Sequence, residues 1–441
     1  MKGLFVAFLI ALGFYGVSLL GFTNEHSLLI AIVAFLVTLW TNEALPLGVV
    51  SLLPLILFPA LGIIDVNTVA PNYSKTIIFL FIGGFMMAIA VEKIGLHKYF
   101  SAKLLNLFPQ TPRGIIYALA ITAALLSALL SNTTITLMLL PIGLFLTENL
   151  KLKVRFLLAI AYGASIGGII TPIGTAPNML LIGFLEDKGL EAPSFGEWIF
   201  MVSPVAIAML LIVPFILSLG LKNECVKDID TKIPKLDDIH KRLLYILGGL
   251  AFLLLINTPL KPYYMGLGLD EKLILLGFGL LMFMPKIGFL EWEDTRKLPY
   301  EIIFLFGAGF SIATAFSQTG LAAEIAQKIS FISTMPLFWM FLFVALFVSF
   351  STEVTSNTAL TSIALPIFYE FAKDMGSDGV VMMMVATIAA SYAFMLPIAT
   401  PPNAIVMSSK VIKVGVMAKI GFFANIAGVI VVASVGYLLW R

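Results

Sequence analysis

The sequence predicts an all-α polytopic membrane protein with about eleven transmembrane helices and two re-entrant hairpins, arranged as two inverted repeats. Three observations predict this class: an apolar composition, apolar runs of membrane-spanning length along the whole chain, and one sequence pattern that occurs twice. Of the 441 residues, 60% are hydrophobic and 12% are charged, whereas a soluble domain is about half apolar and a quarter charged. The mean hydropathy is +1.04.

Charge and cysteine content exclude several classes of protein. A net charge of +2 gives no indication of a nucleic-acid partner. The single cysteine, Cys225, excludes an internal disulfide and argues against a metal cluster. The sequence has no phosphate-binding loop, and no Ser/His, paired Asp or metal constellation falls at predicted membrane depth. We therefore expect that the chain is not an enzyme and that uphill transport would use an ion gradient or a partner.

Eleven apolar runs are long enough to cross a bilayer, which takes roughly 17 to 25 residues. The first run follows Lys2 and lacks a small-residue cleavage site, so we expect a retained span. The predicted spans begin near Leu4, His26, Ala44, Thr76, Phe156, Trp198, Leu243, Lys272, Ile302, Val380 and Val416.

Two further apolar stretches, Gly114–Thr147 and Pro336–Phe371, are interrupted by polar residues near their middle. We interpret each as a hairpin that enters and leaves on one side of the membrane. The predicted organisation is a first transmembrane helix at 1–25, repeat one at 26–225 and repeat two at 226–441. The hairpin of repeat one (114–147) is expected on the cytoplasmic side and that of repeat two (336–371) on the external side.

The repeat is visible in three blocks that share one offset of 225 residues. In the first block, Thr76–Leu96 and Glu301–Leu321, 11 of 21 positions are identical. The other two pairs are Ser131–Thr133 with Ser356–Thr358, and Pro172–Asn178 with Pro397–Asn403. An odd number of predicted spans separates matching points, which predicts opposite orientations. Inverted repeats are typical of secondary transporters, whose site lies near mid-membrane where interrupted helices meet.

The repeated motifs have the chemistry of an ion site. Their prolines lack an N–H and interrupt the helical hydrogen bonds. The freed carbonyl groups suit cations, and N–H groups at the start of a half-helix suit anions. Asn, Ser and Thr oxygens suit sodium, and their hydrogens can hold a carboxylate. Neither pair of motifs contains Lys or Arg, so a bound dianion would depend on bound cations for charge balance.

Alternatively, Ser-Asn-Thr could form a hydrogen-bonded patch that only packs helices together. Both motifs occur twice and in register, which favours an ion and substrate site. Glu353 in the second hairpin is less clear, because its repeat counterpart is Ala128. Two roles stay open for Glu353, that of a buried structural acid and that of a functional acid.

These residues resemble the divalent-anion/sodium symporters, a family that includes bacterial and animal dicarboxylate and citrate carriers. The motifs that carry the resemblance are Asn42–Gly48, the two Ser-Asn-Thr triplets, Gly174–Asn178 and Ala399–Asn403. The resemblance covers essentially the whole chain. It implies a homodimer in which a mobile part moves as an elevator against a fixed scaffold, and sodium-coupled uptake of succinate, malate or fumarate.

The resemblance also implies site residues. One sodium site would use Ser127, Ser131, Asn132 and Gly174, and the other Thr352, Thr355, Asn357 and Ala399. Substrate carboxylates would meet Asn132, Thr133, Thr175, Asn357, Thr358 and Pro401. Thr355 departs from the expected small residue, so its side chain would be incidental. The alternatives are a carrier of another divalent oxyanion such as sulfate or citrate, an arsenite-type exporter on a related fold, and a channel.

Basic residues predict the orientation, because cytoplasmic loops are enriched in Lys and Arg. With a cytoplasmic N-terminus, 20 of the 27 Lys and Arg residues fall inside. The seven outside are Lys75, Lys188, Lys261, Lys272, Lys328, Lys373 and Arg441. We therefore expect a multi-pass protein of the inner membrane, in contact with lipid, with an external C-terminus.

This orientation predicts the behaviour of reporters fused to the C-terminus. A reporter active only outside the cytoplasm should be active there, and a reporter active only in the cytoplasm should be silent. The same two reporters fused to the N-terminus serve as the control. A cytoplasmic signal from the C-terminal fusion would contradict the predicted orientation.

Overall fold

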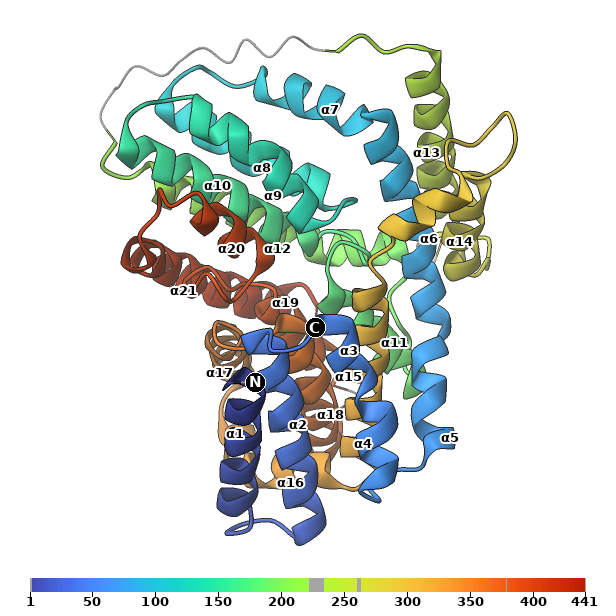
Figure 1. Ribbon diagram of the computed structural model, residues 1–441, viewed down its shortest axis with the longest axis vertical. Coiled ribbons are helices and arrows are strands. Elements are labelled where there is room, and N and C mark those ends of the chain that lie inside the picture. The colour runs from blue at the N-terminus through green and yellow to red at the C-terminus, as the bar shows by residue number, and fades with distance from the viewer. Residues whose placement is uncertain (1, 222–233, 260–262, 378, 441) are drawn as a thin grey trace.

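Every regular element of the computed structural model is a helix within the residues that it describes, which are 2–221, 234–259, 263–377 and 379–440 (Figure 1). The all-α class predicted from composition is therefore confirmed. Cys225 and the predicted boundary between the two repeats lie outside the described residues.

Six helical segments of the described chain are long and apolar enough to cross a membrane, which makes this a multi-pass membrane protein. They are α2 (Asn24–Asn42), α12 (Phe195–Ser218), α13 (Asp238–Asn257), α15 (Tyr300–Gln318), α21 (Val414–Leu438) and Val66–Ile94, which comprises α5 (Val66–Val69), η1 (Ala70–Ser74) and α6 (Thr76–Ile94). Shorter apolar helices include α1 (Lys2–Ser18). The predicted count of eleven spans stays a prediction.

Two predicted spans are shorter or more broken than the sequence indicated. The span expected near Ala44 consists of α3 (Leu47–Leu52) and α4 (Pro54–Ala60), which meet at a proline that cannot donate a helical hydrogen bond. The span expected near Lys272 begins in α14 (Glu271–Leu281), which has only 11 residues. The chain then turns back, since the Phe289 N–H donates to the Met282 carbonyl at 2.7 Å.

The order of helices recurs in the two sequence repeats, and four helix starts keep the offset of 225 residues while the helix lengths differ. The repeat-one helices are α6, α7 (Leu96–Leu105), α8 (Pro112–Ser127), α9 (Asn132–Phe145), α10 (Leu150–Gly168), α11 (Ala176–Asp187) and α12. Their counterparts are α15, α16 (Leu321–Lys328), α17 (Leu337–Ser351), α18 (Asn357–Asp374), α19 (Val380–Ala390), α20 (Pro401–Ser408) and α21. Two short 3-10 helices, η2 (Trp292–Lys297) and η3 (Ser330–Thr334), lie outside this scheme.

Short helices α7 and α16 were not predicted from the sequence. Each follows a glycine in the left-handed conformation, Gly95 with φ of 80° and Gly320 with φ of 81°. Glycine adopts this conformation without steric cost, so the chain turns there after a long apolar helix. The two repeats therefore make the same turn at equivalent positions.

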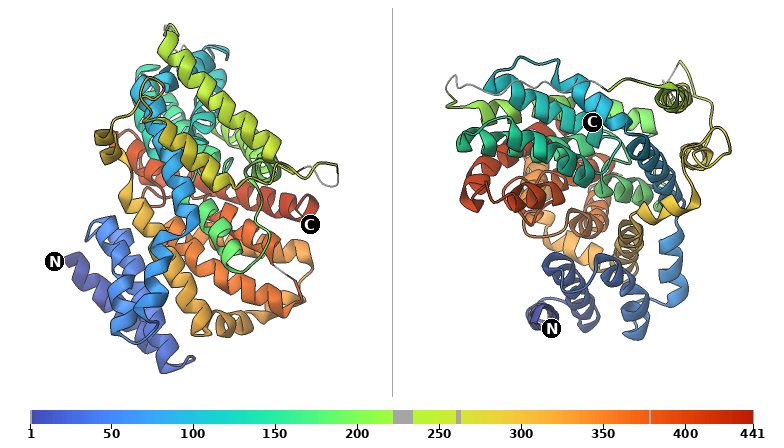
Figure 2. Two further views of the ribbon diagram at one scale, coloured as in Figure 1. Left: turned by 90° about the vertical axis from the view of Figure 1, so that its right-hand side faces the viewer. Right: turned by 45° about the horizontal axis from the view of Figure 1, so that its top comes forward.

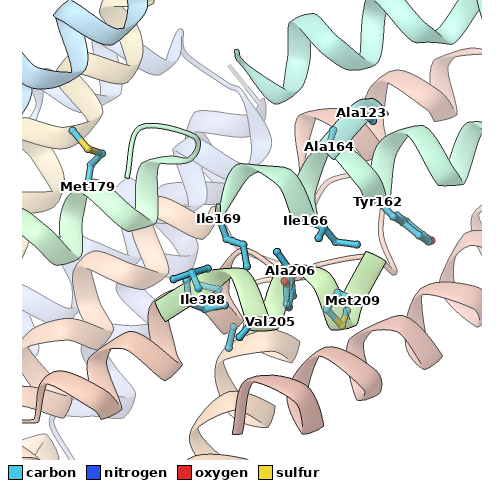
Figure 3. Close-up of a cluster of buried hydrophobic side chains, with 14 of the residues drawn as sticks. Ala123, Tyr162, Ala164, Ile166, Ile169, Met179, Val205, Ala206, Met209 and Ile388 are labelled. Atoms are coloured by element: carbon cyan, nitrogen blue, oxygen red, sulfur yellow. The ribbon is translucent and has the colours of Figure 1, made fainter. Parts of the chain in front are cut away.

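The two repeats pack against each other through a buried apolar core. In Figure 3, Ile166 of α10 and Ile169, directly after that helix, lie next to Ala206 of α12 and Ile388 of α19. All four are at most 2% exposed. Helices α1 and α2 pack together at one end of the molecule, and α13 lies at the other end (Figures 1 and 2). Helix α10 thus packs against helices of its own repeat and against the broken span of repeat two.

Close contact between α8 and α10 depends on glycine. A Cβ at Gly167 would lie 2.1 Å from the Ala124 carbonyl oxygen, and a Cβ at Gly163 would lie 2.4 Å from that of Ala120. Backbone atoms cannot move aside as a flexible side chain can. These two glycines set the distance between the hairpin of repeat one and the helix that leads into its broken span.

We predict that Gly167→Ala lowers the free energy of unfolding by about 1–3 kcal/mol through overpacking. Gly248→Ala in α13 is the matched control, because no heavy atom lies within 4 Å of its added Cβ. This control should leave stability unchanged or raise it by up to about 1 kcal/mol through helix propensity. Thermal unfolding in detergent measures both, and Gly167→Ala melting at or above Gly248→Ala would contradict the packing argument.

Candidate functional site

Each hairpin contains a short non-helical break just before an Asn-Thr pair. In repeat one the break lies between α8 and α9, where the Ser127 hydroxyl donates to Asn132 Oδ1 at 2.5 Å. In repeat two it lies between α17 and α18, where Thr352 Oγ1 lies 2.6 Å from Asn357 Oδ1. Thr352 and Asn357 are the repeat equivalents of Ser127 and Asn132, at the offset of 225 residues. The same hydrogen bond therefore closes both breaks.

Each repeat also has a broken span, and a buried asparagine fastens its break. Asn178 and Asn403 are fully buried and lie just inside α11 and α20. The Asn178 Nδ2 group donates to the Gly168 and Thr171 carbonyls at 3.1 and 2.9 Å, and that of Asn403 donates to the Ala393 and Leu396 carbonyls at 3.0 Å each. The final asparagine of both sequence motifs therefore satisfies carbonyl groups that the broken helix leaves free.

The breaks of the two repeats meet at one cavity of about 270 Å³. Four helices, α9, α11, α18 and α20, begin at residues beside this cavity. Its apolar wall comes from α3, α6 and α15, through Leu47, Phe81, Gly84, Phe85, Ile302 and Leu305. Its remaining lining includes Ser131, Asn132, Thr133, Ser165, Gly174, Thr175, Ser356, Asn357, Thr358, Ser391, Ala399, Thr400 and Pro401.

The cavity has polar groups from the breaks beside a larger apolar wall, and it carries no charged side chain among its described lining residues. Helix N-termini supply partial positive charge there. The residues that precede α9, α11 and α18 are Ser131, Thr175 and Ser356, and none of their side chains caps its helix. The N–H groups of these first turns are consequently available to a ligand. Thr400 differs, because it accepts a hydrogen bond from the Asn403 N–H at 3.3 Å.

Comparison with known families identifies the class of the protein. Residues 35–389 match the family described as citrate transporter. The chain belongs to the citrate transporter family. The predictions that it is a transporter and not an enzyme are confirmed by this membership.

Relatives of this chain are named as sodium-dependent dicarboxylate transporters, in agreement with the resemblance seen in the sequence. The sodium-dependent dicarboxylate transporter SdcS of Staphylococcus saprophyticus is 31% identical over 451 residues, covering 95% of this chain and 86% of the relative. The protein of the same name from Staphylococcus aureus strain USA300 is 31% identical over 441 residues, covering 92% and 85%. The predicted kinship with sodium-coupled divalent-anion carriers is confirmed, and these names support sodium as the coupling ion.

Two solved structures share the fold. The Neisseria gonorrhoeae protein MtrF, described with a class of antimetabolite efflux pumps, superposes with a TM-score of 0.62 at 14% identity, covering 95% of each chain. The YdaH transporter of Alcanivorax borkumensis gives a TM-score of 0.57 at 15% identity, covering 85% of this chain and 87% of that one. At these identities the likeness concerns the fold alone.

The structure brings most of the predicted site residues to one place. Nine of them line the cavity: Ser131, Asn132, Thr133, Gly174, Thr175, Asn357, Thr358, Ala399 and Pro401. Ser127 and Thr352 lie behind the lining and contact it through Asn132 and Asn357. Thr355 is not among the lining residues, and its hydroxyl donates to the Ser351 carbonyl at 3.1 Å.

Two lining residues, Ser165 and Ser391, were missed by sequence reasoning. Both are 3% exposed, and neither hydroxyl oxygen has a hydrogen-bond partner among the described residues. The repeat could not identify them, because Ser165 is equivalent to Ala390 and Ser391 to Ile166. A weaker signal was present, since each serine lies near the end of the helix that precedes a break.

Proposed function

We propose that this chain carries small dicarboxylate anions across the membrane together with sodium ions. The observation that carries the proposal is a pair of equivalent half-sites, one from each repeat, that face a single uncharged cavity. The names of the relatives support the same substrates. The predicted sodium and substrate residues are the residues that we assign to these half-sites.

The anion is held by helix N-termini and by hydroxyl and amide groups. Within the described chain, the hydroxyls of Ser131, Thr133, Thr175, Ser356 and Thr358 make no hydrogen bond, so they can donate to carboxylate oxygens. Hydrogen bonds to charged acceptors are roughly twice as strong as neutral ones. Both repeats contribute donors to the same cavity, which suits a ligand with two carboxylates.

The cations are held by oxygen atoms of the breaks. Asn132 and Asn357 each place a side-chain carbonyl oxygen at the start of a helix, and Gly174 and Ala399 occupy equivalent positions in the broken spans. Amide and backbone carbonyl oxygens are hard ligands suited to sodium. Two sodium ions and one dicarboxylate have no net charge together. Coupling follows, because a dianion without cations would be poorly compensated away from water.

The preferred substrates are four-carbon dicarboxylates: succinate, malate and fumarate. A volume of about 270 Å³ lies just below the range of typical small-molecule sites. The family description favours citrate as a second candidate. Citrate, sulfate and succinate therefore belong in the same uptake assay.

The transport cycle that we propose is an elevator motion in a homodimer of the inner membrane, with the two repeats inverted. The cavity is lined by the hairpins and broken spans together with α3, α6 and α15. A movement of the hairpins and broken spans against these three helices would carry the site across the membrane. The cytoplasmic N-terminus and external C-terminus belong to the same proposal.

The first experiment measures radiolabelled succinate uptake into proteoliposomes. We expect accumulation with an inward sodium gradient and little uptake when potassium replaces sodium. Unlabelled malate and fumarate should compete. If sulfate or citrate competes better than succinate, the preferred substrate is that anion and not a four-carbon dicarboxylate. Equal uptake without sodium would refute sodium coupling.

The second prediction concerns the paired asparagines. Asn132→Ala or Asn357→Ala removes a cation ligand and a substrate donor, and a lost hydrogen bond to a charged group costs about 1.5–3 kcal/mol, or about one to two decades in affinity. Because coupling between sites is reciprocal, the half-saturating concentrations of both sodium and succinate should rise.

The matched control is Asn67→Ala, an exposed asparagine at the start of α5 whose side chain is outside the cavity. It should keep the wild-type sodium and succinate dependence. If both Asn132→Ala and Asn357→Ala also keep it, the two motifs are helix-packing patches and the assigned site is wrong.

A further inference from the structure

Glu353 is a buried acid in the break of the second hairpin, beside the half-site rather than in it. It is 3% exposed and is not among the residues that line the cavity. Its two carboxyl oxygens accept hydrogen bonds from the backbone N–H groups of Met395 and Leu396 at 2.8 and 2.9 Å. The Asn425 Nδ2 group of α21 donates a third at 2.6 Å.

The Asn425 amide has only one orientation that satisfies both of its partners. Its Oδ1 accepts from the Phe394 N–H at 3.0 Å, so its Nδ2 must face Glu353. All three partners of the Glu353 carboxyl group are therefore donors, and a carboxylate can accept all three hydrogen bonds. Glu353 forms no ion pair with any described residue, so this negative charge is not neutralised by a neighbouring Lys or Arg.

This network fixes the segment that leads to the second cation half-site. Glu353 and Asn425 together hold three consecutive N–H groups, at residues 394, 395 and 396. The Leu396 carbonyl then accepts from the Ala399 N–H at 3.2 Å, which orients the residue assigned to the half-site. On its other side, Glu353 follows Thr352, whose hydroxyl contacts Asn357 at 2.6 Å.

Repeat one holds the equivalent break without any charge. Ala128 replaces the acid, and its carbonyl accepts from the Thr171 hydroxyl at 2.5 Å. The Trp198 indole N–H donates to the Ile169 carbonyl at 2.9 Å. The two half-sites have matching ligands but differ by one buried negative charge close to the second.

We propose that Glu353 is a positioning residue for the repeat-two cation half-site, and that its fixed charge makes this the stronger of the two sodium sites. A buried negative charge favours a nearby cation more than it would in water, because the surroundings have a low dielectric constant. The inference rests on the proposed sodium-coupled transport. It assigns the two repeats unequal roles, with sodium filling the repeat-two half-site first.

The test is a sodium titration of radiolabelled succinate uptake by Glu353→Gln in proteoliposomes. Loss of the charge should raise the half-saturating sodium concentration about tenfold. At saturating sodium, the half-saturating succinate concentration and the maximal rate should return close to wild type. A purely structural role would instead lower the maximal rate at every sodium concentration.

Two further variants separate charge from geometry. Glu353→Asp keeps the charge on a shorter side chain, and its sodium shift should be smaller than that of Glu353→Gln, roughly threefold. Thr171→Val removes the neutral contact of the other break, and its half-saturating sodium concentration should stay within about threefold of wild type.

Wild-type sodium dependence in Glu353→Gln, or equal shifts in all three variants, would overturn the inference. If Glu353→Gln does not reach the membrane, Glu353→Asp decides, and an unchanged sodium dependence there overturns it. Failure of the proposed function is a separate result, because wild-type protein would then show no sodium-dependent uptake at all.

Discussion

Unpaired backbone groups are the constraint on which the rest of this structure depends. A hydrocarbon environment offers them no water, so a helix that breaks inside the membrane must satisfy its free groups within the protein. Here a buried asparagine fastens each broken span, and further contacts from Thr171, Trp198 and Glu353 complete the two breaks. Beside the cavity, the first turns of the half-helices keep N–H groups that no side chain caps.

That division gives the cavity its chemistry. Away from the cavity each break is held by hydrogen bonds from Asn178 or Asn403, whereas the first turns of α9, α11 and α18 keep donors that no side chain caps. A bound ligand would pair with these uncapped donors. Because the lining has no charged side chain, an anion would bind there together with cations. Preorganised donors and oxygens of this kind require little rearrangement on binding.

The two repeats have the same order of helices and the same asparagine hydrogen bonds, but they are not electrostatically equal. Repeat one closes its break with a hydroxyl and an indole, and repeat two with a carboxylate and an amide. The two solutions satisfy different backbone groups, because Thr171 and Trp198 donate to carbonyl oxygens whereas Glu353 and Asn425 accept from N–H groups. The divergence leaves a buried charge next to only one half-site.

Fold class, family and the paired motifs were determined by the sequence, because hydropathy, proline placement and a constant offset are all local or periodic along the chain. Tertiary structure alone decided which polar residues share the cavity. Ser165 and Ser391 belong to no repeated pair, and Glu353 meets Asn425 across 72 residues. Contacts between distant residues leave no periodic signal, so only the folded chain could reveal why one acid stands where its repeat has alanine.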